Sequence, residues 1–263
     1  LEPAPETLGG DRPVAVVYPD NYDQSASYPL VLLLHGFGQN GALINRQLGG
    51  TENQAQLGYI LLMPEGRVTA GGQQFWNATQ ACCDQDRTGS DDLGYLIGLI
   101  DEAVDRAGVD PARVFVMGLS NGGFMAERMA CDAASKVTGV VNVSGASFED
   151  AERCQPSRAV TYLRLHSTVD EVIPYEGRVG YPGAVESIER WRSYNACGES
   201  ESDQVLDMET MVEGTETTHR SWRGCADGSE VHLLRMEGVS HVPRLSPEAK
   251  LKMMRLVIDA TTP

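Results

Sequence analysis

A serine between two glycines is the residue of this chain best placed to do covalent chemistry. Gly118-Leu119-Ser120-Asn121-Gly122 directly follows the apolar run Val114–Met117. Glycines two residues before and after a serine, at the end of a strand-like run, are typical of a sharp strand-to-helix turn that exposes the hydroxyl. The pattern therefore predicts that Ser120 is a nucleophile. Because so short a motif also arises by chance, the rest of the chain must supply its partners.

A hydroxyl is a weak nucleophile and needs a neighbouring base. Among the five histidines, His241 lies in a loop after the last strand-like run. In chains with this serine motif the base follows the acid at that point. Asp170 comes just after the preceding run, and loops at the carboxyl ends of parallel strands converge on one crevice. We expect Asp170 to orient the imidazole of His241, with Glu171 and Asp150 as alternatives.

The other histidines are expected to have no catalytic role. His166 precedes the Asp170 loop and should brace it, His232 should be structural within a strand, and His219 should be exposed in a polar segment. Attack by Ser120 also requires two donors for the negative oxygen of the intermediate. One is the backbone N–H of Asn121. The loop His35–Gln39 should supply the other, from Phe37 or, as the neighbouring possibility, Gly38.

Short apolar runs that alternate with helical patterns should position these residues. Several runs are apolar on both faces, as strands of a buried parallel sheet are. The expected strands are Pro13–Tyr18, Leu30–Leu34, Tyr59–Met63, Val114–Met117, Gly139–Val143, Val160–Leu165 and Val231–Met236. The expected helices are Ala42–Leu57, Asp91–Ala107, Asn121–Cys131, Ala184–Asn195 and Pro247–Ala260, the second capped by Ser90. The alternation predicts a mostly parallel, doubly wound α/β sheet in a single domain spanning residues 1–263.

Two segments, 66–89 and 198–229, interrupt this alternation. By contrast, the connection from Val143 to about Arg158 is short and leaves no room for a large cap. An uncapped site that admits bulky substrates is expected.

Six cysteines favour an oxidising compartment and disulfides. The adjacent Cys82 and Cys83 are poorly placed to ligate one zinc ion. Cys197 and Cys225 bracket a polar stretch and are predicted to be bonded to each other. The pairing of the others is left open: Cys82, Cys83, Cys131 and Cys154. The cysteines lead us to expect a secreted protein, and because the opening Leu1–Pro5 shows no signal-peptide pattern, the sequence is expected to be a mature or trimmed form.

The composition limits the partners. The formal net charge of −16 argues against nucleic acid and anionic membrane surfaces, and no apolar run is long enough to span a bilayer. No cofactor or metal is expected. The acids nearest to a metal site should instead be solvated or cap helices: Asp84, Asp86, Asp91 and Asp92. A monomer that takes a neutral ester substrate fits this charge.

Three segments carry a resemblance to a known family. They are His35–Gln39, the stretch from Trp76 through Cys82-Cys83-Asp84 to Asp91–Tyr95, and 118–123. Together they resemble the extracellular feruloyl esterase and polyhydroxybutyrate depolymerase-like branch of the α/β-hydrolases. The resemblance implies secreted ester hydrolysis by a Ser–His–Asp mechanism. It also supports Asp170, although Ser167 replaces a glycine of the family pattern and no tryptophan follows His241.

The predicted function is hydrolysis of carboxylic esters through an acyl-enzyme on Ser120. Aryl or cinnamoyl esters of plant polysaccharide and polyesters are equally compatible substrates. Trp76 and Gln39 are candidate substrate contacts, with core packing as the alternative for Trp76. A peptidase or acyltransferase on the same scaffold is the alternative enzyme, and a non-catalytic carbohydrate-binding module is the alternative outside enzymes.

Overall fold

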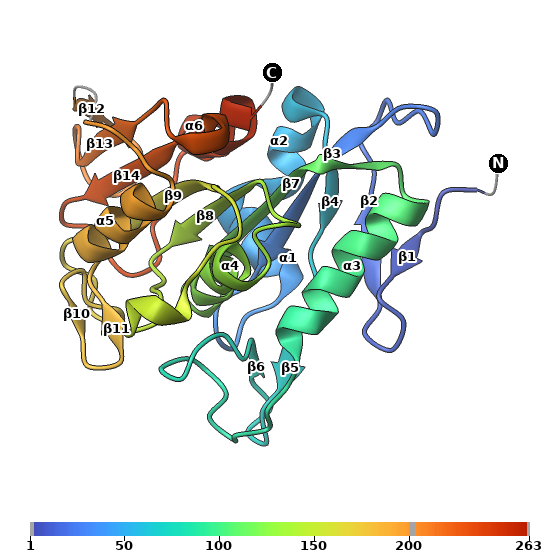
Figure 1. Cartoon of the computed structure of the whole chain (residues 1–263), viewed down its shortest axis with the longest axis horizontal. Helices are drawn as coiled ribbons and strands as arrows, with labels where there is room; N and C mark the ends of the chain where they lie inside the picture. Colours follow the sequence, from blue (N-terminus) through green and yellow to red (C-terminus); the bar gives the residue numbers. More distant parts are fainter. Residues whose placement is uncertain (1–2, 200–202, 262–263) are drawn as a thin grey trace.

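The computed structural model describes residues 3–199 and 203–261, so Leu1, Glu2 and residues 200–202 of the segment 198–229 lie outside the described residues. A ten-stranded sheet runs through the molecule in the order β1-β2-β4-β3-β7-β8-β9-β14-β13-β12 (Figure 1). The six strands from β4 to β14 are parallel to one another, and antiparallel strands extend the sheet at both edges. The mostly parallel, doubly wound sheet predicted from the sequence is confirmed.

The strands of the sheet, from edge to edge, are β1 Thr7–Leu8, β2 Val14–Val17, β4 Ile60–Leu62, β3 Tyr28–Leu34, β7 Val109–Leu119, β8 Gly139–Val143, β9 Thr161–Ser167, β14 Val231–Met236, β13 Thr217–Trp222 and β12 Gln204–Leu206. Two separate hairpins are formed by β5 Arg67–Val68 with β6 Gln74–Phe75, and by β10 Gly177–Arg178 with β11 Tyr181–Pro182. The central strands are buried on both faces, which explains their largely apolar sequences.

Helices cover both faces of the sheet. On the face toward the viewer in Figure 1 lie α3 Asp92–Arg106, α4 Asn121–Asp132 and α5 Ala184–Tyr194. The opposite face of the sheet, with its own hydrophobic core, is covered by α1 Gly41–Leu48, α2 Gly50–Leu57 and α6 Pro247–Ile258. Short 3-10 turns complete the elements at Ala151–Arg153, Ala226–Gly228 and Asp259–Thr261. No helix in the described ranges has the length and apolarity needed to cross a membrane.

Three local expectations are wrong. The single helix Ala42–Leu57 is two helices, because Gly49 adopts a left-handed conformation with φ 74° between them. The cap of α3 is Asp91, not Ser90, since the Asp91 carboxylate accepts the N–H of Gly94 at 2.8 Å. His219 is 4% exposed, because the polar segment forms β13, which pairs with β14 on one side and β12 on the other.

All six cysteines are joined in pairs. The structure joins Cys197 to Cys225, the pair expected from the sequence. The pairings left open are Cys131–Cys154, which ties the last turn of α4 to the loop after β8, and the adjacent Cys82–Cys83. All six cysteines lie in, or pack against, the core on the side of the sheet that α4 and α5 cover.

Candidate active site

Ser120 lies at the tip of the turn between β7 and α4. Its backbone has φ 53° and ψ −117°, a conformation that a residue with a side chain rarely adopts. A Cβ added to Gly118 would overlap the carbonyl of Gly122, and a Cβ on Gly122 would overlap the carbonyl of Leu34. Both glycines are therefore required for the turn that presents the Ser120 hydroxyl, as the motif predicts.

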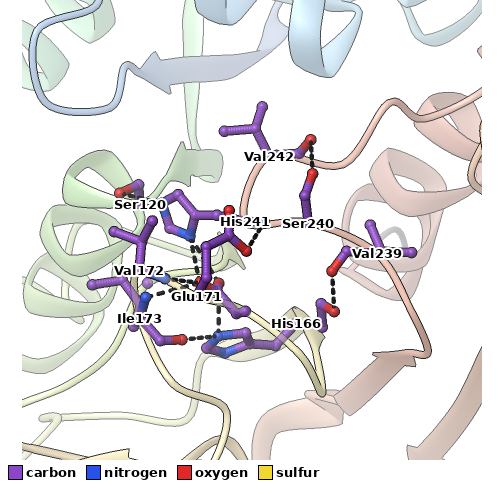
Figure 2. Close-up of polar contacts among 12 residues, drawn as sticks. Ser120, His166, Glu171, Val172, Ile173, Val239, Ser240, His241 and Val242 are labelled. Carbon is purple, nitrogen blue, oxygen red and sulfur yellow. Dashed lines mark hydrogen bonds and ion pairs between the residues drawn. The ribbon is translucent and has the colours of Figure 1, made fainter.

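The three residues predicted for the triad lie in contact. Nε2 of His241 is 2.9 Å from Oγ of Ser120, and Nδ1 of His241 is 2.8 Å and 2.9 Å from the two carboxylate oxygens of Asp170 (Figure 2). They follow β7, β9 and β14, strands that lie near one another in the parallel part of the sheet. The contacts span 121 and 71 residues of sequence.

His166 braces Asp170 from the side opposite His241. Nδ1 of His166 is 2.9 Å from the Arg164 guanidinium, which can only donate, so this nitrogen accepts and the ring proton lies on Nε2. Nε2–H then points to the carbonyl of Ile173 at 2.8 Å and to Oδ2 of Asp170 at 3.2 Å. Burial lowers the pKa of His166 and so keeps the ring neutral.

Asp170 is held as a carboxylate. Burial alone would raise its pKa, but hydrogen bonds from His166, His241 and the backbone N–H of Ile173 outweigh burial and hold that pKa far below its usual range. A second backbone N–H, that of Val172, also donates to Oδ1 at 2.9 Å. The negative charge is thus available to orient His241 and to stabilise its protonated form.

Sequence analysis missed the buried charges behind His166. Arg164 and Glu127 are at most 1% exposed, and their charged groups approach to 3.6 Å. The Glu127 carboxylate also accepts hydrogen bonds from Tyr162 at 2.9 Å and Trp191 at 3.1 Å. Buried charges are tolerated when they are paired and hydrogen-bonded in this way. The available signal was a charged residue within the apolar runs that form β9 and α4.

The alternative acids do not contact the imidazole. Glu171 instead accepts the backbone N–H of His241 at 3.3 Å. Asp150 caps the 3-10 turn Ala151–Arg153. Among the three candidates, only Asp170 is placed to fix the ring of His241.

The two predicted oxyanion donors differ in how the structure constrains them. Asn121 is the first residue of α4, so its N–H has no acceptor within the helix. The N–H of Gly38 donates to the carbonyl of Gln74 at 2.8 Å, so of the two N–H groups considered in that loop Phe37 stays the predicted donor. The Asn121 side chain exchanges hydrogen bonds with the backbone of Trp76, at 2.8 Å and 2.9 Å, and so fixes the start of α4.

The structure contradicts a substrate-binding role for Trp76. Its side chain is 0% exposed, and its indole N–H donates to the carbonyl of His35 at 3.1 Å. Trp76 therefore packs between α4 and the loop His35–Gln39, which we call the oxyanion loop. This is the core-packing alternative for Trp76. Gln39 is partly exposed, and its side-chain oxygen accepts the N–H of Gly36 at 3.2 Å. Contact of Gln39 with substrate stays a prediction.

The acids considered for a metal each accept hydrogen bonds from the protein. Asp84 binds the N–H groups of Thr88 and Gly89, and Asp92 binds Arg12 and the N–H of Asn77. Asp86 accepts the N–H of Ala70, and Asp91 caps α3. Within residues 3–199 and 203–261, no group of three or more His, Cys, Asp or Glu side chains is arranged to hold a metal ion.

Comparison with known proteins places this chain in a family. The family model described as phospholipase/carboxylesterase matches residues 21–188, more than half of the chain. Feruloyl esterase B of Piromyces equi is 25% identical over 245 residues, which cover 88% of this chain and 42% of that protein. Probable feruloyl esterase C of Aspergillus flavus is 29% identical over 174 residues, covering 64% of this chain and 58% of that protein. The chain spans less than half the length of the first curated relatives it matches.

Solved structures show the same fold. The acetyl xylan esterase from Aspergillus awamori superposes with a TM-score of 0.70 at 13% identity, over 95% of this chain and 98% of that chain. A Bacillus cereus carboxylesterase superposes with a TM-score of 0.57 at 16% identity, over 94% of each chain. The predicted α/β-hydrolase fold without a large cap is confirmed. This chain belongs to the phospholipase/carboxylesterase family of α/β-hydrolases.

Proposed function

We propose that the protein is a secreted serine esterase that hydrolyses feruloyl-type esters carried on plant polysaccharide. The observation that carries the catalytic part is the continuous hydrogen-bonded chain from Asp170 through His241 to Ser120. The names of the relatives, feruloyl esterases among them, favour a polysaccharide ester over a polyester.

The reaction follows from the geometry. His241 Nε2 takes the Ser120 proton while Oγ attacks the ester carbonyl, and Asp170 stabilises the resulting imidazolium. The N–H groups of Asn121 and Phe37 hold the negative oxygen. His241 then protonates the departing alcohol. A water molecule, deprotonated by His241, releases the acid from the acyl-enzyme.

Accessibility supports a polymeric substrate. The Ser120 side chain is partly exposed, and the connection from β8 to β9 holds only one 3-10 turn, without a cap helix. A chain-bound ester can therefore reach the hydroxyl without a lid having to open. The three disulfides support export to an oxidising compartment, and we propose that the domain acts there as a monomeric single catalytic unit.

Two measurements test this proposal. Turnover of p-nitrophenyl acetate by the wild type and by Ser120→Ala tests the serine mechanism, and a variant that keeps more than a few per cent of activity contradicts it. Product analysis on feruloylated arabinoxylan and on polyester film tests the substrate. Release of ferulate from the first but no product from the second is expected, and the reverse result would reassign the substrate to polyesters.

A further inference from the structure

A groove lined by positively charged side chains includes the two residues next to His241 in the sequence. Ser240 and Val242 flank His241 in sequence and line this groove, and in Figure 2 they lie on the opposite side of the ring from His166. The groove has a volume of about 520 Å³. Its lining residues, which we call the basic groove, are Arg46, Gln47, Thr210, Ser240, Val242, Pro243, Arg244, Leu245 and Lys250.

The elements around the basic groove connect it to both halves of the reaction centre. Arg46 and Gln47 belong to α1, which begins directly after the loop that carries Phe37. Arg244 follows the loop of His241, and Lys250 lies in the first turns of α6. The groove therefore lies beside the loop of the base, and the helix that follows the loop of Phe37 forms part of its lining.

The charge of the groove is opposite to that of the whole protein. Three cationic side chains and no acidic side chain line it, although the chain has a formal net charge of −16. Lys250 is partly neutralised by Glu52 at 3.1 Å. Among the described residues, no carboxylate pairs with Arg46 or Arg244. Arg46 donates to a backbone carbonyl of its own helix, that of Ala42, at 3.3 Å.

Other acids near the groove are engaged elsewhere. Glu209 is 5% exposed, and its carboxylate accepts the backbone N–H groups of Arg244, Met211 and Val212. Glu171 is turned to the backbone N–H of His241. The guanidinium groups of Arg46 and Arg244 are thus free to bind an anion from solution, and guanidinium geometry favours a carboxylate.

The remaining lining indicates a sugar. Oε1 of Gln47 is buried beside the groove and has no hydrogen-bond partner among the described residues, so it is an unused acceptor in the groove lining. Thr210 and Ser240 also line the groove, and their hydroxyls donate to the carbonyls of Arg244 and Val242, which leaves the hydroxyl oxygens as acceptors. Nucleic acid and anionic membranes carry dense negative charge, which the net charge of −16 of the protein would repel. The carboxylates on a sugar chain are scattered. They would interact mainly with the cations of the groove, because exposed charges are screened within about 10 Å.

We propose that the basic groove is a subsite for uronic-acid carboxylates on the sugar chain that carries the ester. The inference rests on the proposed function, because it names the kind of polysaccharide from which the ester is removed. Arg46 and Arg244 bind the carboxylates and Gln47 binds a sugar hydroxyl. The enzyme is then selective for acidic over neutral polysaccharide esters through binding, and its chemistry on small esters does not depend on the groove.

The test compares one oligosaccharide in two charge states. Feruloylated pectic oligosaccharide is used as isolated and after its uronic acids have been reduced to neutral sugars. We expect the wild type to have a KM for the acidic form lower by between about 2-fold and 30-fold, because each exposed ion pair contributes at most about a factor of five. The preference should disappear in the double variant Arg46→Gln/Arg244→Gln. It should also disappear at about 0.5 M NaCl, because salt screens the exposed charges.

A matched control has the same change in net charge away from the groove. Arg67 and Arg255 line other cavities, so the variant Arg67→Gln/Arg255→Gln should keep the preference. All variants should hydrolyse p-nitrophenyl acetate like the wild type. Equal KM for the two oligosaccharides in the wild type would overturn the subsite while leaving ester hydrolysis intact.

Two other results would also overturn the subsite. One is a preference that survives the Arg46→Gln/Arg244→Gln change. The other is a preference that the control variant loses to the same extent. Absence of any activity on p-nitrophenyl acetate in the wild type would instead contradict the proposed function.

Discussion

Replacement of Asp170 by asparagine tests the acid assignment most directly. Oδ1 accepts the N–H groups of Val172 and Ile173 at 2.9 Å and 2.8 Å, and Oδ2 faces both imidazoles. An asparagine has one acceptor oxygen, which the two backbone N–H groups will retain. Its NH₂ group then replaces Oδ2 and donates to Nδ1 of His241. The ring proton of His241 must move to Nε2, where it blocks acceptance of the Ser120 proton.

The expected loss in kcat is about 10⁴-fold, as for other triads whose aspartate becomes asparagine. At about 1.4 kcal/mol for each factor of ten, this corresponds to about 5.5 kcal/mol of transition-state stabilisation. Steady-state hydrolysis of p-nitrophenyl acetate measures it, with thermal melting as the check that the variant is folded. Because the pKa of Asp170 is held far below its usual range, the wild-type carboxylate stays charged at neutral and mildly acidic pH, where the two proteins are compared.

Glu171→Gln is the matched control, since it removes the neighbouring carboxylate that contacts only the backbone of His241. Its activity should stay within about 3-fold of the wild type, because only one weak hydrogen bond at the surface changes. If Asp170→Asn kept more than a tenth of wild-type kcat, or if Glu171→Gln lost as much as Asp170→Asn, the assignment of the acid would be wrong.

The remaining predictions concern catalytic coupling, pH and packing. Ser120→Ala and His241→Ala should each lower kcat by about 10⁴-fold or more, and the double variant should be no worse than either, whereas additive losses would show that the two act separately. Burial and the neighbouring His232 lower the pKa of His219 to about 4, so its neutral form stabilises the fold above pH 6.5 and that stability is lost as pH falls toward 4. The free energy of unfolding, measured with denaturant at pH 6.5 and near pH 4, should fall less on acidification in His219→Gln than in the wild type, by at most about 3 kcal/mol. An identical fall in both proteins would refute the lowered pKa of His219. Trp76→Ala should lower the free energy of unfolding by about 3–5 kcal/mol and reduce kcat/KM equally for aryl and acetyl esters, and a loss confined to aryl esters would return Trp76 to the substrate site.

The elements that their own stretch of sequence specifies could be predicted. The runs Gly139–Val143 and Val231–Met236 coincide with β8 and β14, because β8 is buried throughout and β14 at five of its six residues, so that buried residues extend to both ends of each strand. The turn at Ser120 could also be predicted, because two glycines meet a steric requirement that the structure bears out at Gly118 and Gly122.

What could not be predicted depends on residues distant in sequence. Trp76 is buried because the oxyanion loop and α4 close over it, and no pattern around Trp76 shows this. The burial of His219 requires β12 and β14 on either side, although the sequence of β13 is polar. The pairing of Arg164 with Glu127 joins β9 to α4, and nothing in either segment alone indicates the partner.

The wide spacing of Ser120, Asp170 and His241 along the chain has a consequence for how activity is acquired. Their three loops become neighbours only when β7, β8, β9 and β14 have all entered the sheet in order. A partly assembled sheet can hold the serine turn, complete with its glycines, and still have no base beside it. Ester hydrolysis is therefore a reporter of finished long-range assembly. During refolding, turnover should return no earlier than protection of the β14 amides from hydrogen exchange, however early the helices form.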